Sequence, residues 1–175
     1  MAILKVTRLP ANKDEQVRIT ILEMIRLVRA SWWAEPVRRC ADTAAVEGFS
    51  PEEKLEAMSR FVRRKMLFLL DPKEVELIRL PVAIAREILY AGRSWGDCDD
   101  FSLILAAMTT SHGYQTGFVT ISTSPHNREF RHVFVCVALD DGKILFLDPS
   151  VSRPYETGHL RIKTWWIPGM LPPRI

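Results

Sequence analysis

Apolar residues recur at helical spacing through the first half of the chain. After an extended start that ends at Pro10, the stretch 14–34 carries apolar side chains at three- and four-residue steps, with Arg and Glu between them. This spacing is typical of an amphipathic helix. Ser50 followed by Glu53 is the pattern of a capping box that opens a later helix. The same spacing, bounded by proline and glycine, predicts further helices at residues 36–45, 51–69 and 81–90.

The period of the apolar residues changes in the second half. A glycine-containing loop at 92–96 precedes a predicted apolar helix at 101–111, which Gly113 ends. Beyond it, a period of two predicts strands at residues 114–122, 130–139 and 143–148, and a further strand in the tail at 158–166. Asp140-Asp141-Gly142 predicts a tight antiparallel turn. The expected fold is therefore α+β, with N-terminal helices and a central helix packed on an antiparallel sheet.

Length and composition narrow the possible classes of protein. A chain of 175 residues with 47% apolar and 26% charged residues fits one globular domain and excludes a disordered or fibrous chain. The formal charge is only +3, and carboxylates are interspersed among the basic residues, so we expect no nucleic-acid partner. The sequence shows no signal peptide and no apolar run long enough to cross a membrane. These features predict a cytoplasmic protein without a membrane partner.

The three cysteines are too few and too far apart for a disulfide scaffold or a zinc site. Cys40 and Cys136 fall inside a predicted helix and a predicted strand, where a free cysteine packs as a small apolar residue. We therefore expect reduced thiols and no metal or other cofactor. A metal site built from the histidines with Asp97, Asp99 and Asp100 is disfavoured, because these residues lack a recognisable ligand spacing.

Cys98 differs from the other two cysteines because it lies where a loop meets a helix. Backbone N–H groups and the helix dipole favour a thiolate at such a position. Gly96 permits close approach of the backbone, and Asp97 is the predicted N-cap. Asp99 and Asp100 act in the opposite direction, because nearby carboxylates raise the pKa of a thiol. The sequence leaves the sign of the net pKa shift open.

A base and a group to orient it are available on neighbouring predicted strands. His132 lies within an apolar strand, and Asp148 ends the next strand along the chain. Because the hairpin pairs these strands antiparallel, the two side chains are expected to lie near one another. A sulfur nucleophile, an imidazole base and an orienting carboxylate are the components of a nucleophilic triad.

Three motifs in order carry a resemblance to a known family. They are Gly96-Asp97-Cys98-Asp99-Asp100, Arg131-His132-Val133-Phe134-Val135 and Leu147-Asp148-Pro149-Ser150. In content, order and spacing, this set resembles the transglutaminase-like superfamily, which has a papain-like fold, over about residues 60–150. The resemblance is to bacterial or phage members of the family.

The resemblance implies roles for individual residues. Cys98 is the expected nucleophile, His132 the base and Asp148 its orienter, in an acyl-transfer enzyme that acts on peptide or carboxamide bonds. Apart from the resemblance, the backbone N–H of Cys98 is the expected oxyanion donor and the indole of Trp95 is a candidate for a second, while the sequence leaves the side-chain donor unassigned. Residues 1–175 are then a single domain, with residues 1–50 as a helical extension and residues 151–175 as a tail.

Other interpretations stay open. The acidic pair after the cysteine differs from the Gly-Gln-Cys-Trp motif of animal cross-linking enzymes, so a protease or amidase is favoured over cross-linking. The fold also suits a catalytically silent structural or assembly module, for example a virion component, that binds a protein partner through the helix at 14–34 or the proline-rich tail. The basic runs Arg38-Arg39 and Arg63-Arg64-Lys65 are predicted to be solvated helix faces.

Overall fold

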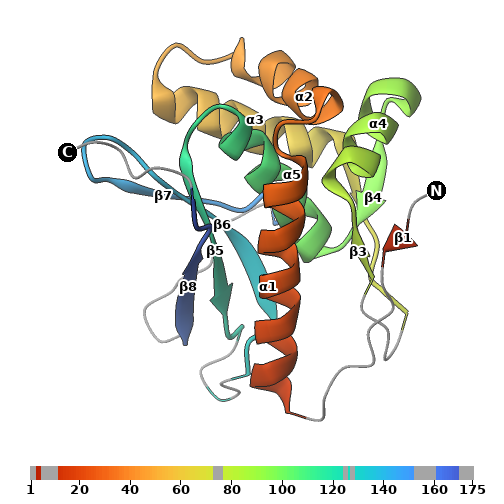
Figure 1. The fold of residues 1–175 in the computed structure, drawn as a ribbon, viewed down its shortest axis with the longest axis vertical. Helices are drawn as coiled ribbons and strands as arrows, with labels where there is room; N and C mark the ends of the chain where they lie inside the picture. Colours follow the sequence, from red (N-terminus) through yellow and green to blue (C-terminus); the bar gives the residue numbers. More distant parts are fainter. Residues whose placement is uncertain are drawn as a thin grey trace.

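The computed structural model describes residues 3–4, 12–72, 77–123, 126, 129–151 and 161–169 (Figure 1). Its helices are α1 (Lys13–Ser31), α2 (Glu35–Ala45), α3 (Pro51–Lys65), α4 (Pro81–Ala91) and α5 (Cys98–Ser111). Its strands are β1 (Ile3–Leu4), β2 (Met66–Phe68), β3 (Ile78–Arg79), β4 (Ser94–Gly96), β5 (Gln115–Ile121), β6 (His132–Ala138), β7 (Ile144–Leu147) and β8 (Ile162–Trp166). The predicted α+β class is confirmed.

Local sequence explains where several helices begin. The side chain of Asn12 caps α1 by accepting hydrogen bonds from the backbone N–H groups of Asp14 and Glu15. The predicted capping box of Ser50 and Glu53 is present at the start of α3. These caps satisfy backbone donors that would otherwise lack a partner within the helix.

The principal sheet has four antiparallel strands in the order β7-β6-β5-β8. β6 and β7 form the predicted hairpin, in which Val135 pairs with Leu147 and Ala138 with Ile144. β8 pairs with β5, which confirms the strand predicted in the tail. The hairpin therefore brings the start of β6 and the end of β7 to the same end of the sheet.

Helix α5 occupies the centre of the molecule. It contacts α1, α2, α3 and α4 as well as β5 and β6 (Figure 1). Its residues 99–110 are all buried, and the strand residues Val133, Val135 and Val137 join the same apolar core. The central position predicted for this helix is confirmed. A smaller apolar cluster, formed by Val119, Ile121, Phe134 and Cys136, is separate from this core.

The predicted helix at 51–69 is wrong at its C-terminal end. α3 stops at Lys65, and Met66–Phe68 forms a strand that pairs parallel with β4, with Phe68 opposite Gly96. Apolar residues at 66 and 69 continue the helical spacing, but those at 66, 68 and 70 fit a strand equally well. Pairing with β4 selects the strand, and it also makes part of the predicted loop at 92–96 extended.

Some predicted features lie wholly or partly outside the described residues. The sequence of residues 75–80 also predicts an extended stretch. The structure describes this stretch only from residue 77, and the described part contains β3, which pairs antiparallel with β1. His159, which the sequence predicts as a solvent-facing residue, and the prolines at 172 and 173 of the tail lie outside the described residues. Among the residues that are described, no helix has the length and apolar character needed to span a membrane.

Candidate functional site

Cys98 is the first residue of α5, directly after the short strand β4. The Asp97 carboxylate accepts a hydrogen bond from the Asp99 N–H at 3.1 Å, which confirms the predicted N-cap. Gly96 adopts a φ of 155°, and a Cβ atom there would clash with the carboxylate of Asp100. The close approach expected at this glycine is therefore between its backbone and the side chain of Asp100.

His132 and Asp148 meet at one end of the β6–β7 hairpin. His132 Nε2 lies 2.5 Å from Asp148 Oδ2. The other carboxylate oxygen, Oδ1, accepts hydrogen bonds from the backbone N–H of Ser150 at 3.0 Å and from its hydroxyl at 2.7 Å. The turn at Ser150 therefore fixes one carboxylate oxygen, and the imidazole contacts the other.

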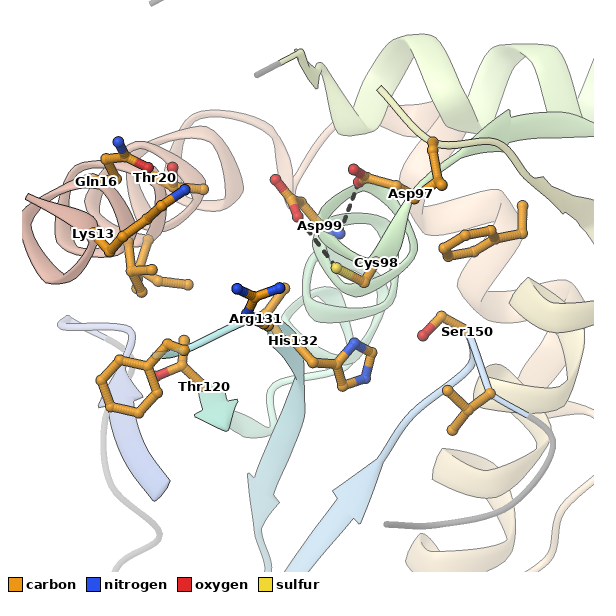
Figure 2. Close-up of a pocket in the computed structure, with 17 residues that line it drawn as sticks. Lys13, Gln16, Thr20, Asp97, Cys98, Asp99, Thr120, Arg131, His132 and Ser150 are labelled. Atoms are coloured by element: carbon orange, nitrogen blue, oxygen red, sulfur yellow. Dashed lines mark hydrogen bonds between the residues drawn. The ribbon is translucent and has the colours of Figure 1, made fainter. Parts of the chain in front are cut away.

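Cys98 and His132 line one cavity of about 440 Å³, shown in Figure 2. Its walls come from α1, the β2 region, the start of α5, and the ends of β5 and β6. The described lining residues are Lys13, Gln16, Val17, Thr20, Ile21, Phe68, Leu70, Asp97, Cys98, Asp99, Thr120, Phe130, Arg131, His132, Val133, Ser150 and Val151. The structure thus brings Cys98 and His132 to one cavity and joins His132 to Asp148 by a hydrogen bond.

The surroundings of the Cys98 sulfur favour the neutral thiol. Burial raises the pKa of Cys98 well above its ordinary value, and the negative charges of Asp99 and Asp97 raise it further. The Sγ atom lies 3.5 Å from Asp99 Oδ1 (Figure 2). A hydrogen bond from the Val133 backbone lowers the pKa, but by less. The net pKa shift of Cys98, whose sign the sequence left open, is therefore upward. The start of the helix alone does not make Cys98 a thiolate.

Asp148 has the charge state that suits contact with an imidazole. Burial alone would raise the pKa of this carboxyl, but hydrogen bonds with His132 and Ser150 outweigh burial and hold it below its ordinary value. Asp148 is consequently ionised near neutral pH and accepts hydrogen bonds on both oxygens.

Two contacts fix α5 and the Asp148 turn relative to the rest of the site. The Ser102 hydroxyl, one turn into α5, donates to the carbonyl oxygen of Val133 at 3.0 Å. The Arg63 guanidinium donates to the carbonyl oxygens of Asp148 at 2.8 Å and Pro149 at 3.3 Å. Arg63 is exposed, as predicted for a solvated helix face, but it also ties α3 to the turn that carries Asp148.

A buried arginine, Arg79, contacts residues of β4, the strand that leads to Cys98. Arg79 is 2% exposed, and its guanidinium contacts Glu87 and the hydroxyl of Ser94. Its backbone N–H donates to Asp100 Oδ1 at 3.0 Å. Burial raises the pKa of Asp100 to about 8. The predicted oxyanion donor Trp95 packs its ring 4.2 Å from this guanidinium and is not among the residues that line the cavity, so its role as a donor stays a prediction.

One solved structure is similar to this chain. It is described as a "putative protease" from Parabacteroides distasonis, with a TM-score of 0.64 and 12% sequence identity. The match covers 98% of this chain and 36% of that protein, so this chain spans about a third of that protein's length. The likeness is one of fold. The sequence matches no protein-family model and no curated protein.

The two other thiols and His112 have structural surroundings. Cys40 and Cys136 are fully buried, and burial raises the pKa of each to about 12. All three cysteines are free. His112 ends α5 and contacts Asp42 at 3.1 Å. Among the described residues, the ligand atoms of Asp97, Cys98 and Asp99 lie within 4.8 Å of one another, a grouping that the sequence did not predict as a metal site.

Several residues at the site were missed from the sequence. Ser150 was part of a recognised motif but had no assigned role, although an Asp followed two residues later by Ser is a signal for the side-chain turn observed here. Phe68 and Leu70 were missed because a helix, and not a strand, was predicted through residue 69. Arg79 lies between apolar residues in Leu77-Ile78-Arg79-Leu80. A single charged residue within an apolar run indicates a buried charge that has a partner, and this was the signal that could have identified it.

Proposed function

We propose that this chain is a cysteine-dependent acyl-transfer enzyme of the transglutaminase-like, papain-related kind, acting on peptide or carboxamide bonds. The observation that carries the proposal is the 2.5 Å contact between His132 and Asp148 at a cavity that Cys98 also lines. The α+β fold and its likeness to a solved structure described as a "putative protease" support the same class of reaction.

The proposed reaction assigns one step to each side chain. The Cys98 sulfur attacks the carbonyl carbon while its proton passes to His132, and the Asp148 carboxylate orients the ring and stabilises its positive charge. His132 then protonates the leaving amine as the carbon–nitrogen bond breaks. Water attacks the resulting thioester, releases the carboxylic acid and restores the thiol. Because burial and the carboxylates of Asp99 and Asp97 raise the pKa of Cys98, the sulfur needs a base to take its proton, and the proposal assigns that task to His132.

The rate of Cys98 alkylation by iodoacetamide tests this proposal. Peptide mapping by mass spectrometry reports Cys98 separately from the buried Cys40 and Cys136. If His132 acts as the base, His132→Ala slows the reaction near neutral pH by about tenfold or more. Asp148→Ala slows it as well, because the ring loses its orienting partner. Rates that neither substitution alters would overturn the proposal.

One observation favours a second candidate, a catalytically silent module that keeps the fold. Burial and two carboxylates oppose ionisation of the Cys98 thiol, which is the environment of an inert cysteine. For such a module, the alkylation rate would follow the thiol pKa alone. It would then keep rising through alkaline pH in the unsubstituted protein and in His132→Ala alike.

A further inference from the structure

Two apolar residues, Phe68 and Leu70, form one wall of the cavity that holds Cys98, the candidate nucleophile. Their side chains are nevertheless 54% and 73% exposed. Apolar side chains that stay exposed within a concave site mark a surface that binds a ligand. The neighbours Leu67 and Leu69 are each 54% exposed but do not line this cavity. Side chains alternate between two sides along β2 and the extended residues that follow it. Phe68 and Leu70 therefore face the site, whereas Leu67 and Leu69 do not.

The wall is held in register with the start of α5. β2 pairs with β4, Phe68 lies opposite Gly96, and the Leu69 N–H donates to the Gly96 carbonyl oxygen at 2.8 Å. Gly96 is two residues before Cys98. The Phe68 ring also packs against Phe101 of α5, with the ring centroids 6.1 Å apart. Backbone pairing and this ring contact therefore hold Phe68 beside the start of α5, as a specificity site requires.

The wall contributed by α1 has a different character. Lys13, Gln16 and Thr20, which are labelled in Figure 2, line the cavity from this helix together with the apolar Val17 and Ile21. The α1 wall therefore offers polar groups beside apolar side chains, whereas Phe68 and Leu70 offer apolar surface alone. A ligand that suits both has a polar backbone and a large apolar side chain, which is the chemistry of a peptide.

We infer that Phe68 and Leu70 form the subsite for a large aliphatic or aromatic residue of a peptide substrate near the bond that Cys98 attacks. This inference rests on the proposed function and adds a substrate class to it. A peptide with serine, glycine or a charged residue at this position does not cover Phe68 and Leu70, which stay exposed to water. Such a peptide is therefore expected to react more slowly.

Dipeptidyl chloromethyl ketones test the subsite. The Cys98 sulfur displaces chloride from the methylene carbon, a carbon–sulfur bond replaces the carbon–chlorine bond, and the thiol proton passes to His132. The probes are the acetyl-leucyl-glycyl and acetyl-glycyl-leucyl compounds, their seryl counterparts and their aspartyl counterparts. At one of the two positions, leucine speeds modification of Cys98 about tenfold or more over serine. Leu70→Ser reduces this ratio to about threefold or less.

Leu69→Ser is the matched control, because it removes a leucine of the same strand extension that does not line the cavity. The control keeps both the leucine preference and the rate with iodoacetamide. Equal rates for leucyl and seryl probes would overturn the subsite, as would a preference for aspartate or equal losses in the two variants. Failure of the proposed function is distinct, since iodoacetamide alkylation is then indifferent to His132.

Discussion

Charged side chains next to Cys98 determine how readily its thiol ionises. Asp97 and Asp99 flank the sulfur in sequence and in space, and Asp97 also caps the helix that presents it. A carboxylate at a helix start stabilises the helix but disfavours a second negative charge a few ångströms away. The same acidic residues that build the start of α5 therefore raise the pKa of Cys98.

Replacing Asp99 with asparagine isolates this effect. Asp99→Asn keeps the size of the side chain and removes the charge nearest to Sγ, so the thiol pKa falls. Alkylation of Cys98 by iodoacetamide at mildly alkaline pH is expected to become about three- to tenfold faster. Asp141→Asn in the β6–β7 hairpin is the matched control and leaves the rate unchanged. A slower reaction in Asp99→Asn would contradict the electrostatic explanation.

Ser150 is expected to position Asp148. Ser150→Ala removes the 2.7 Å hydrogen bond to Oδ1 and leaves the backbone donor in place. The carboxylate then orients His132 less firmly, and alkylation of Cys98 slows about two- to fivefold. Ser111→Ala removes a comparable hydroxyl contact at the far end of α5 and serves as the control. An unchanged rate in Ser150→Ala would show that the backbone contact alone suffices.

The helix α5 and the paired strands β2 and β4 are the elements that place Cys98, the proposed nucleophile. The sequence predicted α5, its cap and the β6–β7 hairpin, because each depends on local signals: an aspartate before an apolar run and an Asp-Asp-Gly turn. β2 and β4 were not predicted because their pairing joins residues about 28 positions apart. The contact of His132 with Asp148 followed from the hairpin, whereas the cavity walls from α1 and β2 depend on tertiary packing.

The buried pair of Asp100 and Arg79 links these elements and predicts a pH effect on stability. Asp100 keeps its proton in the folded protein up to a pH of about 8, whereas an aspartate in the unfolded chain ionises near its ordinary pKa of 3.8. Between these values the folded state binds more protons, so this group's contribution to stability decreases as pH rises, by at most about 1.4 kcal/mol per pH unit.

Asp100→Asn removes this titration. Relative to the unsubstituted protein, the variant is expected to gain free energy of unfolding as pH rises from about 5 to about 8. Urea unfolding at several pH values measures the difference. A difference that is constant across this range, or that shrinks as pH rises, would contradict the raised pKa of Asp100.

At the scale of the whole molecule, the site lies where the central helix meets the sheet. α5 carries Cys98 and packs on β6, which begins at His132 and pairs with β7, the strand that leads to Asp148, so the relative placement of the three residues depends on the packing of one core. The geometry of the site therefore depends on close packing of that core. A substitution that leaves a cavity around α5 should lower both the stability and the activity of the protein.

A cavity in α5 is expected to destabilise the whole molecule. Leu103 is fully buried, and Leu103→Ala should lower the free energy of unfolding by about 2–5 kcal/mol. Leu22 on α1 is 47% exposed, so Leu22→Ala should change it by less than about 1 kcal/mol. Chemical denaturation monitored by tryptophan fluorescence gives both values. Equal effects of the two substitutions would contradict the central position of α5.

The central claim is that His132 and Asp148 act on Cys98 in series. A double-mutant cycle on the rate of Cys98 alkylation, with His132→Ala, Asp148→Asn and their combination, measures this coupling directly. The account predicts that Asp148→Asn slows the reaction when His132 is present and has no further effect when His132 is absent. An equal slowing by Asp148→Asn in both backgrounds would show that the carboxylate acts independently of the imidazole and would contradict the triad.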